Sequence, residues 1–272
     1  MEKCLKGKRI LVTGGSRGIG RAISELFAEH GANVLINYSS QDDGSGHIAA
    51  RDVLNSIKDK SGSTRNYDLD ISDISGHNKM LNFMLHIYGG LDILVNNAGI
   101  AGGFIPYDEI TEQHWDRVQE VNVKGAFFLT QKSISYMNRN QPNEYGLKGS
   151  IIFMSSISKD RGGLLQHHYC PTKAGLSSLV RCFSESLGPK GIRVNGIAPG
   201  TIVTDMNRSQ LEKDRKGTEL MRKSIPLQRL GEPEDVAQVA LFLAYDKMSR
   251  YVNGAIIDVN GGWHNVLAGQ SK

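Results

Sequence analysis

The chain has 272 residues, of which 39% are hydrophobic and 22% are charged, a composition ordinary for one globular α/β domain. Its 32 basic and 28 acidic residues are mixed along the sequence, and the formal net charge is +4. No block of like charge indicates a nucleic acid or a membrane surface as a partner.

The N-terminal stretch MEKCLKGKRILVTGG contains only the apolar run ILV, which is too short for a signal peptide or a membrane span. The three cysteines, Cys4, Cys170 and Cys182, form neither an even framework nor a CxxC pair. We therefore expect reduced thiols in a cytoplasmic protein. No spacing typical of metal ligands occurs, so we expect no metal site.

Short β-branched runs alternate with amphipathic stretches along the chain. Strands are predicted at 9–13, 33–38, 64–69, 91–99, 149–156, 191–200 and 254–259, and helices at 18–30, 47–60, 73–88, 111–138, 169–187 and 233–245. This order predicts an α/β fold: a Rossmann-like, doubly wound sheet of seven parallel strands with helices on both faces. The polar stretches 39–46 and 138–149 are predicted to be surface loops.

A glycine-rich turn, TGGSRGIG at 13–20, follows the first predicted strand and opens the first predicted helix. Gly14 would permit a tight turn, Gly18 a close approach of the backbone to a pyrophosphate, and Gly20 packing of helix on strand. Free N–H groups and the helix dipole then favour an anion. The spacing is not GxGxxG, and a glycine cluster alone is often a plain turn. The strand before it and the helix after it nevertheless favour nucleotide binding.

The end of the second predicted strand bears on which nucleotide binds. In dinucleotide folds an acidic residue there usually binds the ribose 2′-hydroxyl of NAD, and a nearby basic residue indicates the 2′-phosphate of NADP. Here Tyr38 and Ser39 end the strand and Arg17 projects from the glycine turn, so we expect NADP(H) to be preferred and NAD(H) to be possible. Asp42 and Asp43 argue against this preference, but they lie past the strand and are more typical of a solvated loop.

The stretch YCPTK places Tyr169 and Lys173 four residues apart on one helix face, with Cβ atoms about 5–6 Å apart. Pro171 fits the first turn, because a first-turn N–H has no partner within the helix. Free tyrosine has a pKa near ~10, and an adjacent ammonium together with a positively charged nicotinamide would lower it. We therefore expect Tyr169 to act as a general acid and base.

Eight motifs follow one another along the chain: TGGSRGIG, LDI (69–71), NNAG (96–99), VNVKG with Asn122, SS (155–156), YCPTK, RVNGIAPG and IVTDM (202–206). With them the chain resembles the short-chain dehydrogenases/reductases over nearly its whole length. The resemblance implies an NAD(P)-dependent oxidoreductase that transfers hydride between an alcohol or carbonyl and nicotinamide. Adenine would contact Asp70. The implied cofactor contacts are Gly14, Ser16, Arg17, Gly18, Ile19, Gly20, Tyr38, Ser39, Asp70, Asn97, Ala98, Gly99, Tyr169, Lys173, Pro199, Gly200, Ile202 and Thr204.

The same resemblance implies a catalytic tetrad of Asn122, Ser156, Tyr169 and Lys173. Ser156 lies 13 residues before Tyr169, and its hydroxyl would hold the substrate oxygen while charge develops there. Ser155 is the rival position. Asn122 would kink its helix and hold a water in a proton relay toward Lys173; taken alone, it is also compatible with a plain polar residue in a helix.

Two histidines and a cysteine flank the tyrosine. His167 and His168 invite the interpretation of a base or a metal ligand, but without further ligands such a pair is more typical of a helix entry or a pocket wall. Cys170 has no adjacent base in the sequence and is interpreted as a small packing residue.

Substrate selection is expected in the loops at the carboxyl ends of the strands, 100–107, 157–167 and 201–225. These loops contain polar residues among Ile and Leu, a mixture suited to a polyol: Ser158, Gln166, His167, Asn207 and Arg208. We expect the substrate to contact Ser156, Ser158, Gln166 and Tyr169.

The stretches 167–207 and 225–262 resemble the sugar 1-dehydrogenases of the family. This implies that an aldose, expected to be an L-rhamnose-like sugar, is oxidised at C1 to its lactone. The 3-oxoacyl-carrier-protein reductases share the same motifs and remain an alternative. They need a basic patch for the acidic carrier, for which Lys148 and Lys190 are the candidates. A nucleotide-binding scaffold without catalysis is a remote alternative, because the chain keeps the whole tetrad.

We expect one domain over residues 1–272, with the cofactor-binding half at about 1–100 and the catalytic and substrate-binding part at about 100–272. The resemblance implies a homotetramer, in which helices 111–138 and 169–187 form the main dimer face and DVNGGW (258–263) meets another subunit. The 138–149 loop has no assigned role.

Overall fold

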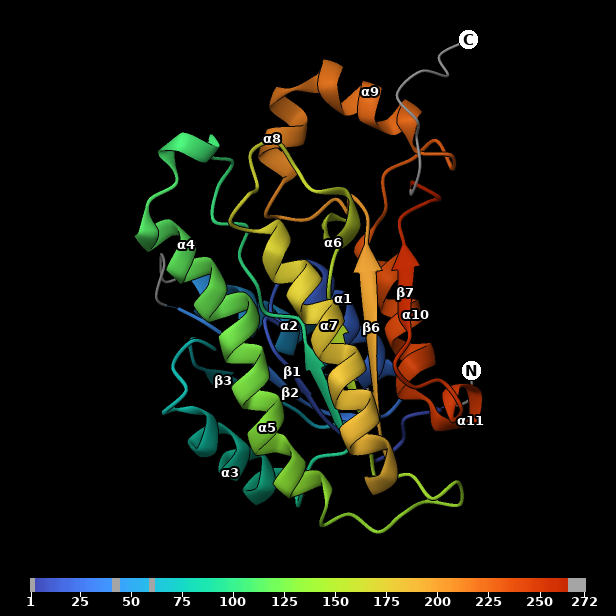
Figure 1. The fold of residues 1–272 in the computed structure, drawn as a ribbon. Coiled ribbons are helices and arrows are strands. Elements are labelled where there is room, and N and C mark those ends of the chain that lie inside the picture. Colours follow the sequence, from blue (N-terminus) through green and yellow to red (C-terminus); the bar gives the residue numbers. More distant parts are fainter. Residues whose placement is uncertain (1–2, 41–44, 59–61, 264–272) are drawn as a thin grey trace.

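The computed structural model describes residues 3–40, 45–58 and 62–263. Within them, seven parallel strands form one sheet in the order β3-β2-β1-β4-β5-β6-β7 (Figure 1), which confirms the predicted Rossmann-like, doubly wound fold. The strands are β1 (Arg9–Val12), β2 (Asn33–Tyr38), β3 (Thr64–Asp68), β4 (Ile93–Asn96), β5 (Gly149–Met154), β6 (Ile192–Pro199) and β7 (Ile256–Val259).

Helices cover both faces of the sheet (Figure 1), because the central strands are apolar on both sides. In β1, Ile10 and Val12 belong to the core on one face and Leu11 to the core on the other. The first core packs against α1 (Gly18–Glu29), α2 (Ser45–Ser56) and α10 (Pro233–Ala244). The second packs against α3 (His77–Tyr88), α5 (Ala126–Met137) and α7 (Cys170–Leu187).

The strand order reverses at β1. From β1 the chain runs outward through β2 to β3, and then returns to β4 on the other side of β1. The loops that follow β1 and β4 therefore diverge and leave a crevice at the carboxyl edge of the sheet, where open α/β sheets bind ligands.

The stretch predicted as one helix at 111–138 has three parts: α4 (Glu112–Gln119), a π-helical turn (Glu120–Gly125) and α5. Asn122 lies inside the π-helical turn, so the distortion expected at this residue is present. Such turns insert an extra residue into a helix and are frequent at functional sites.

Short helices occupy further segments for which no helix was predicted. They are α6 (Ser158–Arg161), α8 (Arg208–Lys213), α9 (Arg215–Ser224), α11 (Asp246–Ser249) and the 3₁₀ turns Tyr107–Glu109 and Gly188–Lys190. In Figure 1, α8 and α9 stand above the carboxyl edge of the sheet. No side chain of α9 is buried, so apolar periodicity could not predict it; Asp214 caps it by accepting a hydrogen bond from the Gly217 N–H.

Helix α3 begins at His77 rather than at the predicted residue 73. The Asp73 carboxylate accepts hydrogen bonds from the N–H and hydroxyl of Ser75, which favours a turn at these residues. None of the helices in the described ranges combines the length and hydropathy that a membrane span requires. No group of three or more His, Cys, Asp or Glu residues in those ranges is arranged to hold a metal ion.

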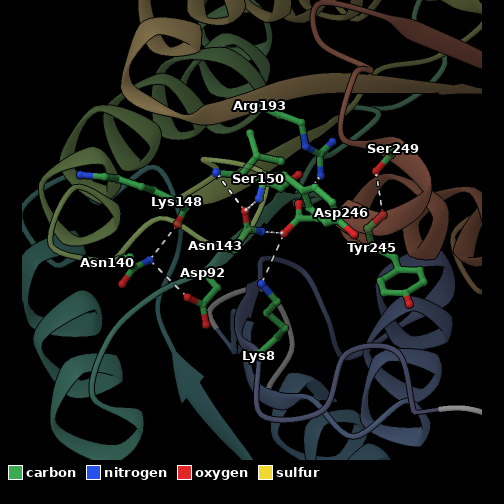
Figure 2. A network of polar contacts seen from close by, with 12 residues as sticks. Lys8, Asp92, Asn140, Asn143, Lys148, Ser150, Arg193, Tyr245, Asp246 and Ser249 are labelled. Carbon is green, nitrogen blue, oxygen red and sulfur yellow. Dashed lines mark hydrogen bonds and ion pairs between the residues drawn. The ribbon is translucent and has the colours of Figure 1, made fainter.

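Asparagines hold the 138–149 loop against the amino edge of the sheet (Figure 2). Asn140 Nδ2 donates to the carbonyls of Leu91 (2.8 Å) and Lys148 (2.9 Å). Asn143 Nδ2 donates to Asp246 Oδ2 at 2.8 Å. This segment, which was predicted only as a surface loop, is therefore fixed by hydrogen bonds at the edge of the sheet opposite to the crevice.

Candidate active site

The loops that follow β1 and β4 are joined by Thr13. Its Oγ1 accepts hydrogen bonds from the N–H groups of Asn97 and Ala98, both at 3.0 Å. Asn97 Nδ2 in turn donates to the carbonyls of Thr13 (2.9 Å) and Gly14 (3.1 Å). The side chain of Asn97, predicted as a cofactor contact, is thus used to hold the glycine turn. The role of Thr13 was missed, because only the fold brings it to Asn97.

The glycines of the turn have the conformations that were expected of them. Gly14 and Gly18 have φ values of +60° and +49°, which residues with a side chain rarely adopt. A Cβ at Gly20 would lie 2.2 Å from the Gly14 carbonyl oxygen. The Arg17 side chain does not cap α1, and the first turn carries no acidic residue, so its N–H groups suit an anion. The residues present therefore fit a dinucleotide pyrophosphate.

The other residues predicted beside the cofactor lie around this turn. Ser16 is buried, and Ile19 packs on the core of the α1 face. A Cβ at Gly18 would lie 3.1 Å from Thr204 Cγ2, so the loop that follows β6 reaches the glycine turn. The rest of that loop is held by main-chain hydrogen bonds and bridges at Pro199, Gly200 and Ile202.

A carboxylate of β3, which the sequence pattern missed, lies beside the end of β2. Asp68 pairs with Tyr38 in the β2–β3 register, and its side chain accepts hydrogen bonds from the N–H (3.1 Å) and hydroxyl of Ser40. The Arg17 guanidinium donates to the hydroxyl of Ser45 close by. Ser39 follows Tyr38, and Asp42 and Asp43 lie outside the described residues. Both a cation and an anion therefore border the expected 2′ position.

Asp70, predicted as the adenine contact, is paired within the chain. Its Oδ2 accepts a hydrogen bond from Arg117 Nη2 of α4 at 2.6 Å, and its Oδ1 accepts from the Ser72 N–H and hydroxyl. Burial acts to raise the pKa of Asp70, but the hydrogen bonds from Arg117 and Ser72 outweigh burial and hold the pKa below its ordinary value. The carboxylate is therefore ionised and fixed, and Arg117 was missed.

Tyr169 and Lys173 lie on the same side of α7, as predicted. Lys173 Nζ is 5.5 Å from the centre of the Tyr169 ring and donates to the Met154 carbonyl at 3.0 Å. A Cβ at Gly99 would lie 3.5 Å from that Nζ, so the end of the NNAG motif borders the lysine. Pro171 occupies the first turn of α7 without disrupting it.

The two candidate serines have different roles. Ser155 Oγ is buried and donates to the Lys173 carbonyl at 2.8 Å, with Ser177 Oγ 2.9 Å away. Ser156 instead is hydrogen-bonded to the phenol of Tyr169. Ser155 fixes β5 to α7, and Ser156 is the serine that faces the tyrosine.

Burial dominates the acid–base properties of the pair. It raises the pKa of Tyr169 to about 12, against the opposing hydrogen bond from Ser156, and it lowers the pKa of Lys173 to about 8. The lowering of this pKa by the lysine ammonium together with a positively charged nicotinamide stays a prediction, because within the chain burial outweighs every group that lowers the pKa of the phenol. Any lowering toward neutrality requires charge that the chain does not supply.

Comparison with known proteins places this geometry in a family. Residues 14–264 match the family model described as Enoyl-(Acyl carrier protein) reductase. The chain is 40% identical to an L-rhamnose 1-dehydrogenase (NAD(P)(+)) of Azotobacter vinelandii, over 94% of this chain and 96% of that one. It is 37% identical to the 3-oxoacyl-[acyl-carrier-protein] reductase FabG of Thermotoga maritima, over 95% and 98%.

Among solved structures, a putative 2-deoxy-D-gluconate 3-dehydrogenase from Agrobacterium tumefaciens with bound NADP superposes with a TM-score of 0.81 at 31% identity, over 95% of this chain and 97% of that one. This chain belongs to the short-chain dehydrogenase/reductase family. It is an oxidoreductase that uses NAD(P) and acts on CH–OH groups.

In this family member Asn122 is fully buried and tied to its surroundings. Its Oδ1 accepts from the Ile100 N–H at 2.8 Å, and its Nδ2 donates to the Ile100 carbonyl (3.0 Å) and to Thr172 Oγ1 (3.2 Å). The side chain therefore joins the loop after β4 to α7. Both Nδ2 protons of Asn122 are thus donated within the chain.

The predicted substrate residues Ser158 and Gln166 both lie in the segment between β5 and α7. Ser158 opens α6, and its N–H donates to Ser156 Oγ at 3.1 Å. Gln166 precedes α7, and its main-chain carbonyl accepts from the Tyr169 N–H at 3.0 Å. Asn207 is different: its side chain accepts from the Thr204 N–H and donates to the Ile202 carbonyl, which makes it part of the loop framework.

Two hollows flank the site. One, of about 820 Å³, runs along α4 from Gly102 to Glu120. The other, of about 540 Å³, lies between the Gly200–Ile202 segment and residues 258–262. Neither is lined by Ser156, Tyr169 or Lys173.

Proposed function

We propose that this enzyme oxidises an aldose at C1 to its lactone, with NADP⁺ preferred as hydride acceptor. The observation that carries the chemistry is the convergence of Ser156, Tyr169 and Lys173, with Lys173 beside Gly99 of the NNAG motif. Asn97 of the same motif donates to the Gly14 carbonyl and so joins it to the glycine turn. The support for a sugar is the 40% identical relative named L-rhamnose 1-dehydrogenase.

In this reaction Tyr169 is the general base, and Ser156 binds the substrate oxygen at C1. The phenolate of Tyr169 accepts the proton of the C1 hydroxyl, while Ser156 Oγ donates a hydrogen bond to the same oxygen as the carbonyl forms. The cofactor supplies, when bound, the acceptor for the hydride that leaves C1. In the reverse direction Tyr169 returns the proton to the alkoxide.

Lys173 and Asn122 would take part in proton transfer to and from Tyr169. Lys173 is buried against the ring of Tyr169, and its lowered pKa lets it exchange a proton near pH 8. We propose that the main-chain carbonyl of Asn122, in the π-helical turn, holds the relay water, because both Nδ2 protons of the side chain are already donated within the chain.

The preference for NADP(H) is supported by Arg17 beside the strand end at Tyr38 and Ser39, and opposed by Asp68. We expect NADPH to bind more tightly than NADH in a fluorescence titration, and Arg17→Met to remove most of the difference. Equal or tighter binding of NADH by the unaltered protein would contradict the preference.

Ser158 and Gln166 are proposed to bind sugar hydroxyls, since a site of polar groups rejects substrates that leave them unpaired. The test is an assay with NADP⁺ and a panel of aldoses, with lactone detection. Turnover of an L-rhamnose-like sugar is the expected result. Absence of lactone from every sugar would refute the proposal.

A second candidate is reduction of a 3-oxoacyl thioester, favoured by the 37% identical relative named FabG. The docking lysines expected for it do not support it. Lys148 and Lys190 immediately precede β5 and β6, at the amino edge of the sheet, opposite to the crevice. Turnover of NADPH with an acetoacetyl thioester, and none with aldoses, would favour this function. Bound cofactor without any hydride transfer would indicate a scaffold.

We further propose one functional domain over residues 1–272, with the cofactor bound mainly by the first hundred or so residues, and a cytoplasmic homotetramer. The three cysteines, all in the described part, are free thiols. Helices α4, α5 and α7 lie along one side of the molecule in Figure 1 and would form the main dimer face. Light scattering that gave a monomer at micromolar concentration would refute the tetramer.

A further inference from the structure

His168 is a fully buried histidine whose ring nitrogens are unpartnered. Its exposed fraction is 0%, and neither Nδ1 nor Nε2 has a hydrogen-bond partner in the described part of the chain. A buried polar group without a hydrogen-bond partner destabilises the folded state. Such a group therefore calls for an explanation, and filling space as a pocket wall does not provide one, because an apolar ring would do the same.

The ring is directed at the loop after β4. A Cβ built on Gly102 would lie 2.8 Å from His168 Nε2 and 2.4 Å from Val118 Cγ2, so the main chain of Gly102 lies against both side chains. Gly102 has a φ of +72°, a conformation that suits glycine. Nε2 of His168 thus lies close to the main chain in the middle of this loop.

The loop itself is held only at its two ends. Asn122 binds both main-chain groups of Ile100, and the Ile105 N–H donates to the Leu165 carbonyl at 3.1 Å. Between these anchors, the main-chain groups of residues 101–104 make no hydrogen bond within the described ranges. Unpaired main-chain groups and an unpaired imidazole therefore face each other.

We propose that His168 is a positioning residue for this loop: in the ligand-bound enzyme its Nε2 forms a hydrogen bond with the main chain at Gly102 and fixes the wall of the substrate cleft beside Tyr169. The proposal rests on the proposed function, in which the loop borders the substrate. His168 acts through the loop and takes no part in proton transfer.

Three variants of His168 test which ring nitrogen forms the hydrogen bond. His168→Phe removes both ring nitrogens, His168→Gln keeps a polar atom near the position of Nε2, and His168→Asn keeps one near Nδ1. For Phe and Asn we expect KM for the substrate to rise about tenfold, the factor that corresponds to ~1.4 kcal/mol, with kcat and the Kd of NADPH unchanged. Gln is expected to restore KM to within about threefold of the unaltered enzyme, since a neutral hydrogen bond can be re-formed.

A stability measurement separates positioning from packing. His168→Phe is expected to melt no lower than the unaltered protein, because it removes a desolvated polar group without a partner. The control is His77→Phe: His77 is equally buried, but its Nε2 lies 2.8 Å from the Ile71 carbonyl, so its loss should lower Tm and leave KM unchanged.

Hydrogen exchange in the NADPH complex needs no substrate. Amides of residues 101–104 are expected to exchange about tenfold faster in His168→Phe than in the unaltered protein, with Gln between them, as loss of one hydrogen bond implies. Equal exchange and equal KM in all variants would overturn the inference. Failure of the proposed function is a separate result: it would appear as no lactone from the unaltered enzyme, with the exchange difference still present.

Discussion

Two buried cations lie at opposite edges of the sheet. Arg193, at the amino end of β6, is 3% exposed and donates to Asp246 Oδ1 and to the Leu243 carbonyl, both at 2.8 Å (Figure 2). Lys173, at the carboxyl edge, is 5% exposed and donates to the Met154 carbonyl at 3.0 Å. In the ranges that the structure describes, no carboxylate lies within ion-pair distance of Lys173.

This difference separates the amino edge of the sheet, where the polar groups stabilise the fold, from the carboxyl edge, where the candidate catalytic residues lie. At the amino edge the buried cation has a carboxylate partner: Asp246 accepts hydrogen bonds from both Asn143 and Arg193, although Arg193 Nε has no hydrogen-bond partner among the described residues. At the carboxyl edge burial shifts the pKa of Lys173 to about 8 and that of Tyr169 to about 12 without a counter-charge in the chain. Groups whose pKa is strongly shifted are typical of functional sites.

The largest effect is expected from Tyr169→Phe, which removes only the reacting oxygen. Turnover should fall by about 10²–10⁴, the usual contribution of a general acid–base group, while the Kd of NADPH stays within about twofold. The matched control is Tyr88→Phe, which removes a hydroxyl that donates to the Ser63 carbonyl at 2.9 Å. The control should lose stability and keep its turnover. A Tyr169→Phe enzyme with most of its turnover would refute the assignment.

Arg193→Met addresses the opposite edge. Removing one partner of a buried pair leaves Asp246 short of its main donor, and we expect a loss of about 3 kcal/mol in the free energy of unfolding, measured in urea. KM and the Kd of NADPH should not change, because the crevice is at the other edge. A loss of turnover without a loss of stability would contradict this division.

Arg117→Met is expected to have the smallest effect, restricted to the adenine end of the cofactor. Without Arg117 the buried Asp70 carboxylate loses its charged partner, so the Kd of NADPH should rise about tenfold, as loss of a charged hydrogen bond implies. Binding of reduced nicotinamide mononucleotide, which has no adenine, should be unaffected. Equal weakening of both ligands would indicate a general structural role instead.

Much of the fold and the tetrad could be predicted from the sequence. The alternation of apolar strands and amphipathic helices defined the seven-stranded sheet, since strands buried on both faces must be apolar throughout. The placement of Tyr169 and Lys173 on one side of α7 followed from helical periodicity.

The missed features depend on neighbours distant in sequence. Asp68 reaches the end of β2 only through the β2–β3 register, and Arg117 reaches Asp70 across 47 residues. Helix α9 buries no side chain, so it leaves no apolar pattern. The pKa values of Tyr169 and Lys173 depend on burial, which the spacing of the two residues does not reveal.

The most direct test is the pH dependence of unfolding for Lys173→Met against the unaltered protein, both without cofactor. The pKa of Lys173 is lowered to about 8 in the folded state, whereas that of a free lysine is about 10.4. The penalty for burying the ammonium is therefore fully present below about pH 8 and fades as the pH rises toward about 10.4. We predict that the variant is about 2–3 kcal/mol more stable at pH 7, that this gain fades by about pH 10, and that turnover is lost. A variant that is less stable at pH 7, by an amount independent of pH, would show that Lys173 stabilises the fold. That result would contradict the predicted penalty for burying its ammonium.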